Sequence, residues 1–340
     1  MNDYDYLYDA DTVRLAIILG VLVTTLFYER VQITTGGAIV PGYLALFVGR
    51  PLYIAATLIT SYLTYLIVNS LISRRYILYG RRKYEIEILT TLCLVSFWFG
   101  LAHLLIGVDH LVTALVGIGF VLPAIIAHDV FRQGARKTYL AILANVAIIA
   151  TVIYVFSAFQ RVAPWHEEHR ATGLGSGPFA FSLDLLLPAI FVSVLAGMAV
   201  FHRLGLRCGG FVSGAYLGLH LLRPLDLVFT VAVSLATFLL VTRVLMHYML
   251  IFGRRKLGMM ILIAAILAWA GEIALRAATD GSYVPWDGFH VITLMVPALI
   301  ANDAQRQGME RTLWGAALTA VAVFASMNLL QAGLFAAGLL

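Results

Sequence analysis

Long runs without a charged residue are the feature that most constrains this chain. The 23 residues between Arg50 and Arg74, and the last 29 residues after Arg311, contain no Asp, Glu, Lys or Arg. A helix that crosses a bilayer needs about 20 apolar residues. Only 12% of the residues are charged and 61% are hydrophobic, whereas a soluble domain carries about 25% charged residues. The sequence therefore predicts an all-α polytopic membrane protein, with the lipid bilayer as its first partner.

The chain also repeats itself. When the sequence is shifted by 173 positions, Gly36-Gly37 aligns with Gly209-Gly210, and Gly80-Arg81-Arg82-Lys83 aligns with Gly253-Arg254-Arg255-Lys256. After one further residue of shift, Arg132-Gln133-Gly134 aligns with Arg306-Gln307-Gly308. Matches that recur at a nearly constant spacing indicate an internal duplication. We predict a first transmembrane repeat at 1–159, a polar, Pro/Gly-rich extracytoplasmic linker at 160–182, and a second, diverged repeat at 183–340.

Each repeat contains about six apolar segments, which we expect to be transmembrane or re-entrant helices. The second and fifth segments of each repeat are short and contain Gly or Pro, so they are candidates for re-entrant or broken helices. If every segment crosses, the chain spans the bilayer about a dozen times. The segments are roughly 13–28, 33–49, 52–73, 86–106, 111–127 and 138–159, followed by 185–201, 207–222, 226–248, 257–275, 288–302 and 312–338.

The distribution of Lys and Arg orients the repeats. With an even number of crossings per repeat and the N-terminus outside, both Gly-Arg-Arg-Lys strings and both Arg-Gln-Gly strings fall on the inner side, as the positive-inside rule requires. The two repeats are then parallel, and the chain is expected in the cytoplasmic (inner) membrane. The net charge of +5 reflects this orientation, so nucleic acid is not a predicted partner.

Two repeated polar motifs are candidate binding sites for an anionic polymer or a partner protein. We interpret Gly-Arg-Arg-Lys as a cytoplasmic loop that is either a stop-transfer anchor or a site for carboxylates or phosphates, which Arg and Lys bind. Asp-x-x-Arg-Gln-Gly is either a self-satisfied Asp/Arg pair at a helix end or a polar site at a membrane mouth. The residues are Arg81, Arg82, Lys83, Asp129, Arg132, Gln133 and Gly134, with Arg254, Arg255, Lys256, Asp303, Arg306, Gln307 and Gly308.

A further set of residues is expected to shape a path through the membrane. Gly and Pro inside an apolar segment free backbone groups, which is tolerated where they face protein or a cavity; close helix packing through small residues explains the same pattern. Two prolines are expected to break or kink helices, and one ionisable group at the inner end of the first span is a candidate partner for a cation or amine. The set is Glu29, Pro41, Gly42, Tyr43, Pro123, Tyr216 and Pro297.

Other polar motifs carry no chemistry that we recognise. His166-Glu167-Glu168-His169 lacks the H-E-x-x-H spacing of a zinc site, and no Walker-type lysine loop is present in the sequence. We therefore predict no metal site and no bound cofactor, and the catalytic residues stay unknown.

Each repeat resembles the small membrane subunit of poly-γ-glutamate synthase, the CapC or PgsC family. The resemblance runs through Val40-Pro41-Gly42-Tyr43-Leu44, Tyr79-Gly80-Arg81-Arg82-Lys83 and Leu122-Pro123, and ends at Arg132-Gln133-Gly134. Family members are usually one repeat long, so this chain resembles a fused tandem. It departs from the family pattern at His128, where Asn is usual, and in the second repeat, which lacks Pro-Gly-Tyr and the Glu.

The resemblance implies a role in capsule formation, as a membrane subunit of a complex that makes and exports poly-γ-glutamate or a related anionic amino-acid polymer. It also implies a CapB/PgsB-like ATP-dependent amide ligase as the partner that holds ATP and a divalent metal. This chain would then be a subunit of the synthase that does not bind ATP, alone or as a homo-oligomer. Two alternatives stay open: a membrane anchor for another ATP-dependent peptide ligase, and a stand-alone secondary transporter.

Overall fold

The computed structural model describes residues 10–78, 80–105, 117–162, 178–248, 253–286 and 289–338. Several predictions lie outside these ranges: residues 111–116 of a fifth segment, residue 288, most of the linker 160–182 with His166 to His169, and the side chain of Arg254. The chain divides into two compact units, Met1–Glu167 and Glu168–Leu340, and this division falls within the predicted linker.

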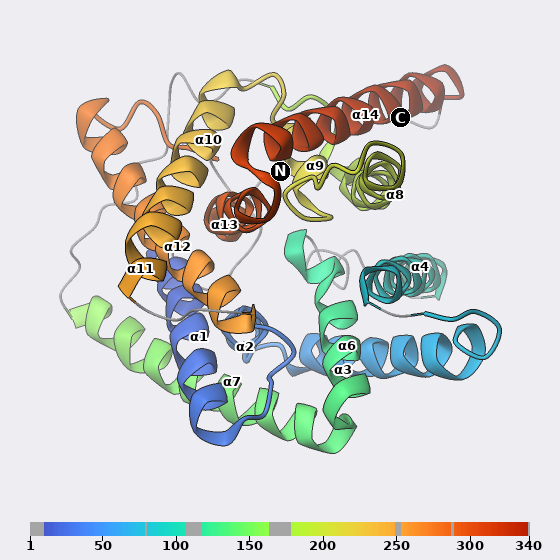
Figure 1. Ribbon diagram of the computed structural model, residues 1–340, viewed down its shortest axis with the longest axis horizontal. Coiled ribbons are helices and arrows are strands. Elements are labelled where there is room, and N and C mark those ends of the chain that lie inside the picture. Colours follow the sequence, from blue (N-terminus) through green and yellow to red (C-terminus); the bar gives the residue numbers. More distant parts are fainter. Residues whose placement is uncertain are drawn as a thin grey trace. The chain divides into compact units, whose positions relative to one another are not determined.

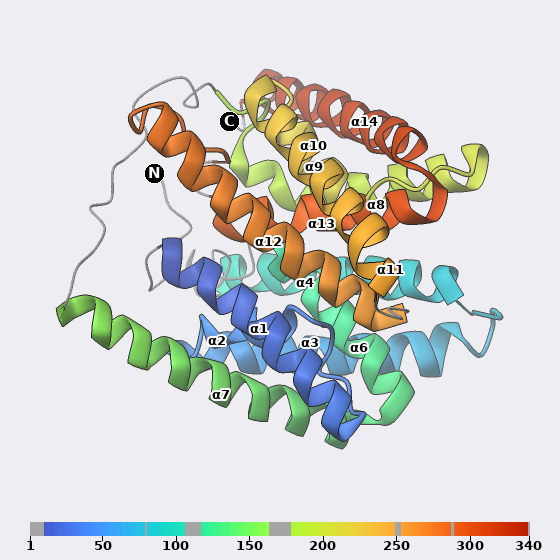
Figure 2. The ribbon, with the colours of Figure 1, turned by 60° about the vertical axis from the view of Figure 1, so that its left-hand side comes forward.

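The described residues of unit 1 form four long helices and two shorter helical segments. The long helices are α1 (Ala10–Val31), α3 (Pro51–Leu66, continued by a π-helical turn η1, Ile67–Ile72), α4 (Gly80–Leu105) and α7 (Ala135–Val162). The shorter segments are α2 (Val40–Ala45) and α6 (Leu122–Gln133), the latter preceded by the 3₁₀ turn η2 (Gly117–Phe120). Helix α1 packs beside α7 (Figure 2), and α2 contacts both.

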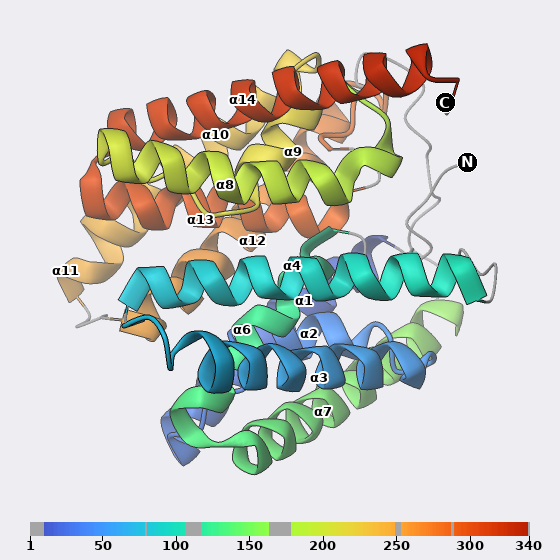
Figure 3. The same ribbon diagram turned by 90° about the vertical axis from the view of Figure 1, so that its right-hand side faces the viewer.

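Unit 2 repeats this arrangement. Its long helices are α8 (Leu186–Leu204, after the turn η3, Leu183–Leu185), α10 (Pro224–Leu239, continued by η4, Leu240–Leu245, and α11, Met246–Tyr248), α12 (Gly253–Ala278) and α14 (Met309–Ala336). The other two are α9 (Ser213–Leu219) and α13 (His290–Gln307). Helix α13 packs against α10, α12 and α14 (Figure 1), and α8 runs alongside α14 (Figure 3).

The same helix pairs pack in both units, which confirms the predicted duplication at the level of structure. In unit 1, α6 contacts α3, α4 and α7, and in unit 2 its counterpart α13 contacts α10, α12 and α14. Both third helices even end in a π-helical turn, η1 and η4, at the same place in the repeat. The fold class predicted from sequence, an all-helical protein of two repeats, is therefore confirmed for the described residues.

Eight helices in the described part of the chain are long and apolar enough to cross a membrane, four in each unit. The second and fifth segments of the repeat are not among them. Helices α2 and α9 have only six and seven residues, whereas a helical crossing needs about 20. The expectation of about a dozen crossings is therefore corrected to eight long helices plus shorter segments.

Helix α3 turns small polar residues inward and large apolar residues outward. The buried side chains of α3 are Thr57, Thr60, Ser61 and Thr64, and several of these hydroxyls donate to backbone carbonyls of the preceding turn. On the same helix Leu52 is 78% exposed. This pattern suits a lipid solvent, in which apolar surface needs no cover and small residues let helices approach closely.

The second segment of each unit is broken by two glycines in left-handed conformations. Gly36 and Gly37 have φ of +74° and +108°, and Gly209 and Gly210 have φ of +72° and +100°. A Cβ on Gly36 would lie 2.8 Å from Ile126 of α6. The backbone therefore crosses the buried fifth helix at a distance that only glycine permits, and the segment continues as the short helix α2 or α9.

Candidate functional site

The Gly-Arg-Arg-Lys strings begin helices rather than forming loops, which corrects the sequence interpretation. Gly80 starts α4 with φ of +57°, and Gly253 starts α12 with φ of +59°. Among the described residues, no neighbour lies within 4 Å of a Cβ at either position, so the turn into the helix, not space, requires glycine. The cations then occupy a helix N-terminus, where the helix dipole disfavours positive charge. Nearby carboxylates would offset this cost.

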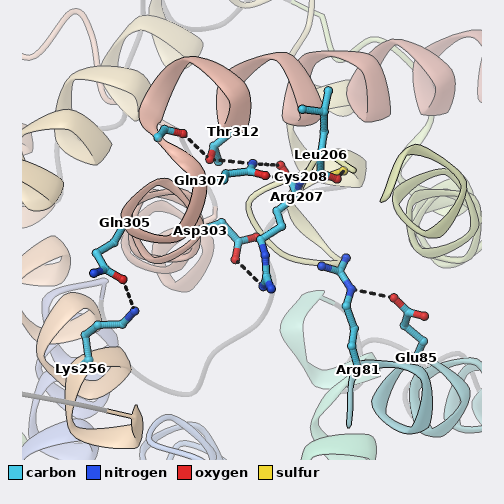
Figure 4. A network of polar contacts seen from close by, with 11 residues as sticks. Arg81, Glu85, Leu206, Arg207, Cys208, Lys256, Asp303, Gln305, Gln307 and Thr312 are labelled. Carbon is cyan, nitrogen blue, oxygen red and sulfur yellow. Dashed lines mark hydrogen bonds and ion pairs between the residues drawn. The ribbon is translucent and has the colours of Figure 1, made fainter. Parts of the chain in front are cut away.

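Unit 1 supplies such carboxylates within α4 itself. The Nε atom of Arg81 donates to Oε1 of Glu85 at 2.8 Å (Figure 4). Lys83 is only 5% exposed, and its Nζ donates to Asn69 Oδ1 at 3.4 Å and lies over the ring of Phe131. Glu85 and Glu87 are 1% and 2% exposed, so the cations of unit 1 lie beside buried acids.

A pair formed by a buried glutamate and a half-buried histidine is the centre of this cluster, and sequence reasoning missed it. Nδ1 of His128, on α6, lies 2.8 Å from Oε2 of Glu87 on α4, and the ring of Tyr84 meets that of His128 edge-on. The signal was available: two glutamates within an apolar span, where ionisable groups are costly and usually functional. His128 was noted only as a departure from a family pattern.

The aspartate of the second motif holds the broken segment in place. Asp129 is 2% exposed, and its Oδ2 accepts the backbone N–H of Gly36 at 3.1 Å. In unit 2 Asp303 lies 3.7 Å from Nη1 of Arg207, which follows α8. The structure thus joins Asp129 and Asp303 to the second segment of their own unit, a long-range contact that an Asp/Arg spacing of three did not predict.

The glutamine of the motif is a clamp in both units. Gln133 accepts the backbone N–H of Thr34 at 2.9 Å and donates to the carbonyl of Thr34 and the hydroxyl of Thr138. Gln307 repeats all three bonds with the backbone of Arg207 and the hydroxyl of Thr312, at 2.9, 2.8 and 2.9 Å (Figure 4). Because both amide hydrogens are used within the chain, these side chains have no donor left for a ligand.

The remaining residues of the motif have separate roles. Gly134 and Gly308 join two helices at φ of +88° and +94° with ψ near 152°, a region open essentially to glycine alone. The arginines, by contrast, are on the surface: Arg82, Arg132, Arg255 and Arg306 are exposed. These exposed arginines are therefore accessible to a ligand or partner at the surface. We call the part of each unit that carries both motifs its cationic end.

Unit 2 builds its cationic end with fewer acids. Lys256 is 8% exposed, and its Nζ donates to Oε1 of Gln305 on α13 at 2.6 Å (Figure 4). The positions of Glu85 and Glu87 are taken by Gly258 and Met260. Asp303 is the carboxylate that the structure places beside Arg207.

The predicted path residues are mostly packing residues. Pro41, Gly42 and Tyr43 are buried, and a Cβ on Gly42 would lie 2.7 Å from a backbone oxygen of α1. The close-packing interpretation of this segment therefore fits the structure. Tyr216 is fully buried in α9.

The other predicted path residues are placed differently. Pro123 lies in the first turn of α6, which it begins rather than kinks, whereas Pro297 lies inside α13. Glu29 is exposed near the end of α1.

A second polar network lies in unit 2 at the start of α10 and was not predicted. Asp226, 1% exposed, accepts the hydroxyl of Tyr283 at 2.8 Å and the backbone N–H of Trp286 at 3.2 Å. Trp286 stacks on His220 with ring centroids 4.0 Å apart. Burial raises the pKa of Tyr283, aided by its hydrogen bond to Asp226, so the phenol stays a donor. This network fixes the turn between α12 and α13.

In comparisons with known proteins, both units match one family. A family model described as "Capsule biosynthesis CapC" matches twice, over residues 19–139 and 192–313, which together exceed half of the chain. The capsule biosynthesis protein CapC of Bacillus anthracis is 38% identical over 124 residues, 36% of this chain and 81% of the relative. The PGA biosynthesis protein CapC of Bacillus subtilis (strain 168) is 35% identical over 143 residues, 42% of this chain and 93% of the relative. No solved structure matches the chain.

Proposed function

Because its two units each match the family model, this chain belongs to the capsule biosynthesis CapC family, and we propose that it is the membrane subunit of a complex that makes and exports poly-γ-glutamate or a related anionic amino-acid polymer. The double match carries this proposal. The names of the two relatives, one for capsule and one for PGA biosynthesis, support it.

We propose that the ATP-consuming step belongs to a partner, an amide ligase of the CapB/PgsB kind that holds ATP and a divalent metal. The exposed arginines Arg82 and Arg132, with Arg255 and Arg306 in unit 2, support docking of an anionic polymer or of the ligase, since clustered positive charge attracts anions over long distances. Glu29, exposed near the same end, is a proposed contact for a cation or amine.

The membrane location suits such a role. A polymer with one carboxylate per residue cannot enter the hydrocarbon core of a bilayer unless protein shields its charges. The free energy of burying an unpaired charge there is much larger than the free energy gained from a typical contact. A subunit whose described residues include eight apolar helices would shield the polymer from lipid beside the ligase. We propose the cytoplasmic membrane, with the N-terminus outside and the cationic ends inside, on the positive-inside rule.

The test is genetic and biochemical. We expect deletion of the gene to abolish extracellular polymer, and we expect an ATP-dependent amide ligase to co-purify with the tagged chain from native membranes. In complemented cells, Arg82→Ala or Arg132→Ala should abolish polymer output while the protein still inserts. As a control, Arg203→Gln, at an exposed position in the last turn of α8, should leave output unchanged. Full polymer yield from both variants rejects the site, and full yield after deletion rejects the function. Ion-coupled uptake by liposomes with this chain alone favours a transporter instead.

A further inference from the structure

The buried lysine of unit 2 lacks the acids that its counterpart has in unit 1. Lys83 shares α4 with two buried glutamates, Glu85 and Glu87, and the charge of Glu87 acts directly on it. Helix α12 has Gly258 and Met260 at those positions. Both ammonium groups donate to a neutral amide, Lys83 to Asn69 at 3.4 Å and Lys256 to Gln305 at 2.6 Å, so the two lysines differ in the acids nearby.

The other charges around Lys256 make its position less favourable. Arg306 and Arg207 repel its positive charge, and Asp303 is the group that attracts it. Asp303 also faces Arg207, with 3.7 Å between Oδ1 and Nη1 (Figure 4). Asp303, 13% exposed, thus acts on both Lys256 and Arg207. A buried charge that is not neutralised is strongly unfavourable, so this place favours a further anion.

A neighbouring amide adds a different requirement. Asn302 of α13 occupies the position that His128 has in unit 1, where the imidazole reaches Glu87. The Oδ1 atom of Asn302 is buried and accepts no hydrogen bond from the described residues. A buried acceptor without a donor costs free energy, and an N–H group brought by a ligand would satisfy it.

We propose that the cationic end of unit 2 is a binding site for a carboxylate on an amide-linked acidic chain, held by Lys256 and Arg207 with Arg306 at the rim, and with Asn302 accepting an amide N–H. The proposal rests on the proposed function, since polyglutamate offers both groups in each residue. Unit 1 fills the corresponding place with its own glutamates and takes no anion there. The two units thus differ at the buried lysine: unit 2 binds a carboxylate of the polymer there, and unit 1 neutralises that place internally.

The test measures binding to the purified full-length chain. The chain is reconstituted in nanodiscs of neutral lipid and is added in increasing amounts to a fluorescent γ-linked glutamate oligomer at physiological salt. The fluorescence anisotropy of the oligomer reports binding. Lys256→Met and Arg207→Gln should each weaken binding about tenfold, because each removes a charge-assisted contact. Met260→Glu should weaken it similarly, since it installs in unit 2 the acid that neutralises unit 1.

Two controls separate the site from general electrostatics. Arg311→Gln removes one exposed positive charge from the first turn of α14 and should leave the affinity unchanged. An oligomer that carries a photoreactive group should cross-link in the wild-type chain to peptides containing Arg207 or residues 253–262, and this readout does not depend on a variant that folds.

Several results would overturn the assignment. They are equal affinities for wild type, Lys256→Met and Arg207→Gln, cross-links confined to unit 1, or displacement of the oligomer by inorganic phosphate at an equal concentration of charge. The last result would assign the site to phosphate. These results would reject the binding site but not the proposed function, because deletion of the gene would still abolish the extracellular polymer.

Discussion

The two units share a skeleton but differ in how they treat the charge inside it. Both turn into the fourth helix through a left-handed glycine, clamp the broken segment with a glutamine, and leave an arginine exposed beside it. They differ around the buried lysine: both lysines donate to an amide, but Lys83 also has the charge of Glu87 nearby, whereas unit 2 has Met260 at that position. The shared features are set by backbone geometry, whereas the differing features are set by side-chain chemistry.

This difference teaches what a duplication preserves. The glycine pair and the glutamine clamp cannot change without breaking the crossing of the second segment over α6 or α13, so both copies keep them. Glu87 and His128 form a pair, and a pair can be exchanged only as a whole, because removal of one partner leaves a buried charge. Unit 2 has neither member of this pair and carries Met260 and Asn302 at the two positions.

The largest expected effect tests the shared skeleton. Gly36→Val and Gly209→Val each add a clash with the fifth helix, at 2.8 Å from Ile126 and 2.6 Å from Ile300, to an unfavourable positive φ. Each should cost about 3 kcal/mol or more and remove most folded protein, as measured by size-exclusion chromatography in detergent. Gly100→Ala, where nothing lies within 4 Å, serves as the control. A well-folded variant of either unit would break the claim of a common skeleton.

A smaller effect tests the clamp. Gln133→Leu or Gln307→Leu leaves a half-buried backbone N–H and carbonyl without their partner, and each should lower the free energy of unfolding by about 1–2 kcal/mol. Thermal unfolding in detergent, followed by intrinsic fluorescence, measures the change. We expect similar losses from the two variants, since the bonds are the same. If only one variant were destabilised, the clamp would not be a common device.

The smallest effect separates the units. Glu87→Gln keeps the shape of the side chain but removes the charge that faces Lys83 and His128, and it should destabilise the chain by about 1–2 kcal/mol. At the same position in unit 2, Met260→Leu is a nearly volume-conserving exchange within an apolar contact and should cost less than about 1 kcal/mol. Equal melting temperatures for Glu87→Gln and wild type would contradict the proposed electrostatic difference between the two units.

Much of the fold was predictable because lipid imposes simple rules. Charge-free runs predicted the long helices, and the fixed shift of the repeat predicted two units with the same packing. The site was less predictable. Gln133 binds the backbone of Thr34, 99 residues away, and the Glu87/His128 pair joins residues 41 apart. Such contacts depend on which helices become neighbours, and local spacing carries no information about that.

The measurement that tests the account most directly is the sidedness of the two cationic ends. In a background with Cys93→Ser and Cys208→Ser, Arg82→Cys and Arg255→Cys each place one thiol at an exposed position at the start of α4 or α12. Whole cells are treated with a membrane-impermeant maleimide before and after permeabilisation. We predict that both thiols react only after permeabilisation, because both cationic ends face the cytoplasm. Reaction of either thiol in intact cells would contradict the account.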